Sequence, residues 1–191
     1  MASISLKYKS KQGNLTAPGD VDLGAMIPIA TTVVGAGGSS TVTFSSIPQN
    51  YEHLQIRAIH KPSTSGDFDW SIQFNGDTAA NYSKHQVFGD GTSAIATGTA
   101  SQTQISGGFN QYTDWGSTVM DILDYQNTNK NKTVRTLTGA DRNGAGVVGI
   151  RSGYWNSTSA VSSILIIPTS GSTGFAQYSS FALYGIKRAG A

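Results

Sequence analysis

From residue 41 onward, hydrophobic and polar residues alternate in short runs separated by turn residues. Within residues 53–60, Leu54, Ile56 and Ala58 alternate with Gln55 and Arg57. This period of two is typical of a strand with one buried face. The same pattern predicts strands over residues 41–44, 53–60, 69–74, 82–88, 104–109, 117–126, 132–140, 147–155, 161–167 and 178–187. The stretch 92–103, rich in Thr, Ser, Ala and Gly, is predicted to be a long surface loop.

Many short strands without a helical pattern predict an all-β fold, and we expect a jelly-roll-like two-sheet β-sandwich with an extended N-terminal arm. Trp70 is expected in the core. The apolar run 164–167 predicts a fully buried central strand, and Phe181 and Leu183 should point inward from the last strand.

The first 40 residues differ from the rest. Residues 1–36 contain neither Trp nor Phe, and they offer too little apolar surface to fold alone. Residues 35–40 consist of Gly, Ala and Ser and predict a flexible joint. We therefore divide the chain into an attachment arm with its hinge, residues 1–40, and a β-sandwich domain, residues 41–191. The residues expected to anchor the arm are Lys7, Lys9, Lys11, Pro18, Ile27 and Ile29.

Composition excludes several classes of protein. Only 13% of the residues are charged and Glu occurs once, which argues against a disordered chain, a coiled coil or a helical bundle. With no cysteine, the chain can form neither a disulfide nor a thiolate metal site. A formal charge of +2 is too small to indicate nucleic-acid binding. No apolar run approaches the roughly 20 residues of a membrane span, so we expect synthesis in a cytoplasm and no membrane partner.

The candidate catalytic residues form no recognisable constellation. His53 and His60 are an odd number of residues apart on one predicted strand, so they should project to opposite faces. The same argument separates Asp121 from Asp124, which disfavours a glycosidase-like carboxylate pair. His85 lies on a polar strand, where a surface role is expected. The sequence predicts no enzyme, no cofactor and no metal centre, although turn carboxylates leave a calcium ion open. These carboxylates are Asp67, Asp69, Asp77 and Asp90.

Aromatic residues near polar segments suggest a binding surface. Trp115 lies in the polar stretch 110–116, and the set considered is Tyr112, Trp115, Tyr154 and Trp155. Two roles stay open for them, namely burial at a subunit interface and stacking on a host glycan. The low-charge, Ser/Thr-rich surface favours a homo-oligomer, with a trimer as the preferred arrangement.

Several segments resemble virion proteins of tailed bacteriophages, in particular those of marine and cyanobacterial hosts. They are FSSIPQNYEHLQIR at residues 44–57, IQFNG at 72–76 followed by Asn81 and Tyr82, and GF at 174–175 followed by YSSFALYGIK at 178–187. LKYKSKQG at 6–13 and APGD at 17–20 are similar to the attachment ends of such proteins. These motifs mark strands and corners and contain no catalytic residue.

The resemblance implies a virion component, either a capsid decoration protein or fibre, or a tail-fibre or receptor-binding subunit. Its partners would then be other virion proteins, reached through the arm. An extended basic arm joined to a β-domain suits such anchoring, by strand addition or by binding in a groove. The alternative is a glycan-binding module that recognises a host surface polysaccharide.

Overall fold

In the computed structural model, residues 25–110 and 114–189 are described, and they form twelve β-strands and no helix. No part of them is therefore a helix able to span a membrane. The strands are β1 (Met26–Val33), β2 (Val42–Phe44), β3 (His53–His60), β4 (Phe68–Phe74), β5 (Tyr82–Gly89), β6 (Ala94–Gln102), β7 (Ile105–Asn110), β8 (Gly116–Leu123), β9 (Lys132–Arg142), β10 (Ala145–Trp155), β11 (Ile164–Ser170) and β12 (Ser180–Ile186).

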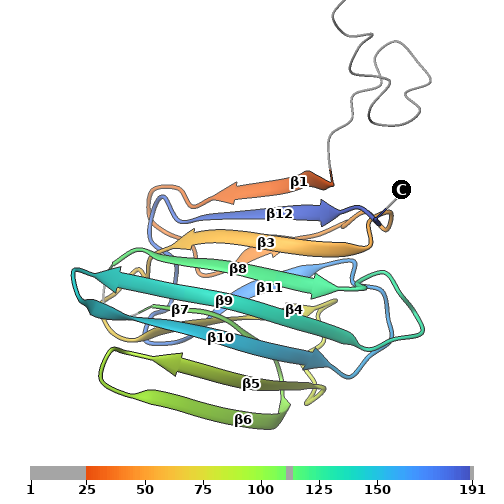
Figure 1. The fold of residues 1–191 in the computed structure, drawn as a ribbon. Coiled ribbons are helices and arrows are strands. Elements are labelled where there is room, and N and C mark those ends of the chain that lie inside the picture. Colours follow the sequence, from red (N-terminus) through yellow and green to blue (C-terminus); the bar gives the residue numbers. More distant parts are fainter. Residues whose placement is uncertain (1–24, 111–113, 190–191) are drawn as a thin grey trace, which may run out of the picture.

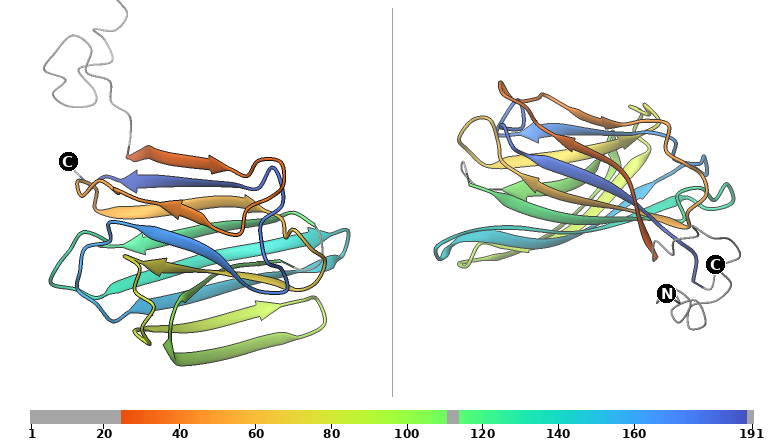
Figure 2. Two further views of the ribbon diagram at one scale, coloured as in Figure 1. Left: turned by 180° about the vertical axis from the view of Figure 1, so that it is seen from behind. Right: turned by 90° about the horizontal axis from the view of Figure 1, so that it is seen from above.

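The strands form two antiparallel sheets. The larger sheet has the order β1-β12-β3-β8-β9-β10-β5-β6, and the smaller has the order β2-β11-β4-β7. The smaller sheet lies against one face of the larger (Figures 1 and 2). The predicted all-β sandwich is therefore confirmed.

The strand pairs are nested in the manner of a jelly roll. β5 pairs with β6, β4 with β7, β3 with β8 and β2 with β11, and successive pairs alternate between the two sheets. This nesting is what rolling up one long hairpin produces. Two additions widen the larger sheet. The hairpin β9-β10 is inserted between β8 and β5, and the pair β1-β12 extends the sheet beyond β3.

Ten of the twelve strands coincide with predicted runs to within a few residues, and β3 matches its run at both ends. The prediction of a loop over 92–103 is wrong, because residues Ala94–Gln102 form β6. β6 pairs only with β5 and buries neither face, so its sequence needs no apolar alternation.

The predicted boundary at residue 40 is also wrong. β1 pairs with β12 along its length, which places Ile27 and Ile29 in the larger sheet. Proline can occupy this strand because β1 lies at the sheet edge. The predicted hinge is fixed by hydrogen bonds, since the backbone amides of Ser39 and Phe175 each donate to the carbonyl of the other residue, at 3.0 and 2.7 Å. The sandwich domain therefore already includes Met26.

Side chains from both sheets meet in an aromatic core. The ring of Trp70 on β4 contacts that of Phe181 on β12 at a centroid distance of 5.9 Å, and Phe175 lies 4.8 Å from Phe181. Trp70, Phe181 and Leu183 are buried as predicted. β11 is central in the smaller sheet, but only one of its faces is fully buried, with Ile164 and Ile166 inward.

The strand registers define two ends of the sandwich. At the proximal end, Met26 of β1 pairs with Ile186 of β12, which pairs with His53 of β3. At the distal end, His60 of β3 pairs with Gly116 of β8. β1 therefore begins at the proximal end, next to the end of β12 (Figure 2).

Candidate functional site

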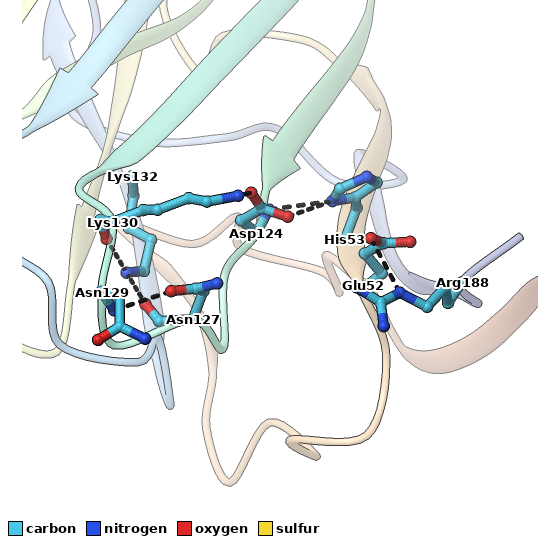
Figure 3. Close-up of polar contacts among 8 residues, drawn as sticks. All are labelled: Glu52, His53, Asp124, Asn127, Asn129, Lys130, Lys132 and Arg188. Atoms are coloured by element: carbon cyan, nitrogen blue, oxygen red, sulfur yellow. Dashed lines mark hydrogen bonds and ion pairs between the residues drawn. The ribbon is translucent and has the colours of Figure 1, made fainter.

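A cleft of about 770 Å³ lies at the proximal end. Three chain segments and Ile27 of β1 line it, because β1, β12, β3 and β8 are neighbours in the sheet and all have an end there. The segments are residues 50–52 before β3, residues 124–129 after β8, and residues 187–188 after β12. Figure 3 shows the polar contacts among eight residues in and around this region.

The loop before β3 is held by two tyrosines. Tyr125 is fully buried, and its hydroxyl donates to the carbonyl of Pro48. Burial raises the pKa of Tyr125, so the hydroxyl stays protonated and serves as a donor. The ring of Tyr51 packs on Gly185, where an added Cβ would lie 2.3 Å from that ring. Gly185 thus lets the loop approach β12 closely.

The loop after β8 is organised by a buried cation. The Nζ of Lys132 donates to the carbonyls of Asn127, Lys130 and Thr158 at 2.6, 2.7 and 3.1 Å. Burial lowers the pKa of Lys132, while these carbonyls provide the hydrogen bonds that a buried ammonium requires. Asp124 begins the loop with a positive φ of 49°.

Glu52, His53 and Asp124 place ligand atoms within 4.8 Å of one another, so we tested this cluster as a metal site. Each carboxylate already has a cation partner, since Asp124 lies 2.7 Å from the Nζ of Lys130 and Glu52 lies 3.5 Å from the Nε of Arg188. The hydrogen bond from Lys130 is the main cause of the lowered pKa of Asp124.

The ring of His53 is also engaged within the protein and is poorly available as a metal ligand. Its Nδ1 accepts a hydrogen bond from the backbone amide of Asp124 at 3.0 Å, which engages the ring lone pair that faces the cluster. A divalent ion would have to displace this amide as well as Lys130 and Arg188. The arrangement is an ion-paired network, suited to hydrogen bonding with a polar ligand.

His60 and the two carboxylates considered as a catalytic pair each have a partner within the fold. His60 is fully buried, and its Nε2 lies 3.1 Å from the Oγ1 of Thr118, which is also buried. Burial lowers the pKa of His60 to about 3, so the ring is neutral and structural. Asp121 faces Arg135 at 3.8 Å, and Asp124 faces Lys130, so these two carboxylates have separate partners.

Three of the four turn carboxylates considered for calcium have separate partners, and the fourth, Asp67, is exposed. Asp69 pairs with Arg151 at 2.8 Å, Asp77 accepts hydrogen bonds from Asn81 and Trp155, and Asp90 accepts bonds from its own turn. Among the described residues, none of these carboxylates belongs to a cluster of potential metal ligands.

The predicted aromatic residues that the structure describes, Trp115, Tyr154 and Trp155, do not assemble into one site. Trp115 is 43% exposed at the distal end, with the Nζ of Lys61 5.7 Å from its ring centroid. Tyr154 and Trp155 lie at the proximal end of β10, where Tyr154 is partly exposed. Trp155 is buried and stacks on Tyr82, so it cannot contact a glycan. Outside the described residues lie Tyr112, Lys7, Lys9, Lys11 and Pro18.

Sequence reasoning missed both the cleft and an exposed apolar surface on the larger sheet. The cleft depends on strand register, which brings together loops far apart in the sequence. The apolar surface does leave a signal, because Val147 and Val148 are adjacent and must point to opposite faces of β10. Comparison with known protein families and with curated proteins finds no match to this chain.

Proposed function

We propose that this chain is a non-enzymatic structural component of a tailed-phage virion, made in the host cytoplasm and incorporated into the particle. Residues 1–24 anchor it to other virion proteins, and the β-sandwich is displayed on the particle surface. The role is that of a capsid decoration or fibre protein, or of a tail fibre. The resemblance of residues 44–57 and 178–187 to such proteins favours this class.

The observation that carries the proposal is the way the chain enters the sandwich. Among the described residues the first buried side chain is that of Ile27, and the carbonyl of Ala25 accepts a hydrogen bond from the amide of Lys187 at 2.9 Å. The preceding residues, which include Lys7, Lys9 and Lys11, are continuous with β1, which begins at the proximal end beside the end of β12. A segment of this kind is available for binding to a groove or a sheet edge of a partner. The distal end then faces outward.

The chain should be found in purified particles of the phage that encodes it. We expect quantitative mass spectrometry to give a fixed copy number per particle, and antibody labelling to decorate one defined part of the particle. A chain present in the lysate but absent from purified particles would contradict the proposal.

A second candidate function is the recognition of a host glycan, and the proximal cleft favours it. Its volume of about 770 Å³ is within the range of ligand sites. The side chains that line it are rich in amides, which can donate to and accept from sugar hydroxyls, and Tyr51 adds an aromatic ring. The amides belong to Asn50, Gln126, Asn127 and Asn129.

A glycan array with the full-length chain tests this alternative. If the cleft binds a glycan, Asn127→Ala and Asn129→Ala should weaken the signal while Trp115→Ala at the distal end should not. The reverse result would place the glycan at Trp115. If the unmodified chain binds no glycan on the array, the glycan-binding function is rejected and the structural role remains as the proposal.

A further inference from the structure

The outer face of the larger sheet carries an apolar patch. We define the apolar face as six side chains that are each between 38% and 60% exposed, namely Ile59, Val87, Val119, Leu137, Val148 and Ile150. Their strand neighbours in sequence point inward, as the alternating burial of β3, β8, β9 and β10 shows. The six side chains therefore share the face opposite the core.

The strand registers align these side chains in two rows across the sheet. In the first row, Val119 pairs with Leu137, Leu137 with Ile150, Ile150 with Val87, and Val87 with Ala96. The second row runs from Ile59 through Ser117, Gly139, Val148 and Gly89 to Ala94. Neither row contains a charged residue from β8 to β6. A solvated antiparallel sheet usually presents polar residues on its outer face, so this surface is unusual for one that stays exposed.

The patch is large enough to form the apolar centre of a protein interface. Strands are about 4.8 Å apart and alternate residues about 6.7 Å apart along a strand, so two rows across five strands cover roughly 320 Å² before side-chain relief is counted. A stable complex typically buries about 800 Å² on each partner, with an apolar centre and a polar rim. The two rows thus supply somewhat less than half of one side of an ordinary interface.

The shape and charge of the patch fit a second copy of the chain. Val148 stands between Gly139 and Gly89, and it borders a depression of about 480 Å³ that Ile59 and Trp115 also line. A second depression of about 500 Å³ lies beside Val87 and Ile150. Projecting side chains and depressions therefore occur on the same surface. Between β8 and β6 a contact between two such faces brings no like charges together within the two rows. The first row continues on β3 with Arg57, and Asp90 and Asp141 line the first depression.

We propose that the apolar face is the contact between two copies of this chain, packed face to face about a two-fold axis. An isologous contact uses the same patch on both subunits, which is what a single self-complementary surface provides. The inference goes beyond the proposed function, since it holds whether or not the chain belongs to a virion. It replaces the trimer favoured by the sequence with an even number of copies, and it places Trp115 at the rim of the interface.

Light scattering of the full-length chain tests the contact. The wild-type protein should have a mass of about twice 20.0 kDa. Leu137→Lys and Ile150→Lys, tested separately, should each raise the dissociation constant by more than about tenfold, because an unpaired ammonium would be buried in the contact. Both positions are exposed within one chain, at 55% and 59%, so the variants should fold normally.

Val33→Lys is the matched control. Val33 is 61% exposed and lies at the end of β1, four strands from β9 in the sheet order. It should leave the dimer intact, and circular dichroism should show the same fold in all variants. A wild-type monomer, a trimer, or an assembly that survives both face substitutions would overturn the proposal.

Discussion

The indole Nε1 of Trp155 donates a hydrogen bond to the Oδ2 of Asp77 at 2.7 Å. Trp155 ends β10 in the larger sheet, while Asp77 follows the turn at the end of β4 in the smaller one, so the bond links the two sheets. Asp77 also accepts hydrogen bonds from the Nδ2 of Asn81 and the amide of Ala79, both at 2.9 Å. These bonds, with that of Asn81 first, lower the pKa of Asp77.

Asp77→Ala should lower the free energy of unfolding by about 2 kcal/mol, because the buried indole N–H loses its acceptor. For a chain of this length that corresponds to a fall in Tm of about 4–8 °C. Asp67→Ala, on the exposed loop before β4, should change stability by less than about 0.5 kcal/mol. Thermal unfolding followed by circular dichroism measures both. Equal effects would contradict a specific role for the bond.

In the wild-type protein, part of the loss of folding stability at acid pH should come from Asp77. The folded pKa lies below the ordinary value of 3.8, so the folded state favours the carboxylate. Its contribution is complete above about pH 4 and is lost as the pH falls through the folded value. Urea unfolding between pH 5 and pH 2 should show a smaller acid loss for Asp77→Ala than for the wild type, and parallel curves would argue against this linkage.

The burial of His60 should make the free energy of unfolding depend on pH in a second range. The folded pKa is about 3 and the ordinary value is 6.5, so below pH 6.5 the unfolded chain binds a proton that the folded chain excludes. Stability is therefore complete above pH 6.5 and declines as the pH falls towards 3, by about 2 kcal/mol between pH 7.5 and 5. His60→Leu should remove this part of the decline in urea unfolding. The same slope in both proteins would show that burial of His60 does not control it.

Lys132 should be a major determinant of the stability of the loop after β8, which borders the cleft. Lys132→Met removes three hydrogen bonds from a buried ammonium and should cost about 2–4 kcal/mol, with faster amide exchange in residues 127–131. Lys130→Met is the matched control, because Lys130 is exposed and its ion pair with Asp124 should contribute less than about 1 kcal/mol. Hydrogen exchange that rises equally in both variants would contradict this assignment.

The corrected domain boundary also makes a prediction. Removal of residues 1–24 should leave stability within about 0.5 kcal/mol of the full chain. Removal of residues 1–36 deletes β1 and takes Ile27 and Val34 out of the core, which should cost about 3 kcal/mol or more. It also exposes the edge of β12, which favours aggregation. Equal Tm values for the two truncated chains would restore the boundary at residue 40.

Sequence patterns predicted those parts of the fold in which burial is one-sided. β3 follows its alternation from His53 to His60, and Trp70 and Phe181 lie in the core as expected. β6 escaped prediction because it buries neither face and is held by backbone pairing with β5 alone. β1 was assigned to the attachment arm because its single neighbour, β12, is at the other end of the sequence.

The candidate sites were less predictable for a related reason. The cleft forms where loops after β8 and β12 meet the loop before β3, and only the sheet order brings Glu52 near Asp124 and Arg188. The aromatic residues were proposed as a group from their types, yet Trp115 and Tyr154 lie at opposite ends of the sandwich. The apolar face requires the registers, because its six side chains come from five strands.

The most direct test of the structural role measures how much of the chain lacking residues 1–24 enters virions, relative to the full-length chain made in the same infected cells. Anchoring through these residues predicts that the truncated chain folds, stays in the lysate and is absent from purified particles. Incorporation of the truncated chain at the full-length level would contradict the account.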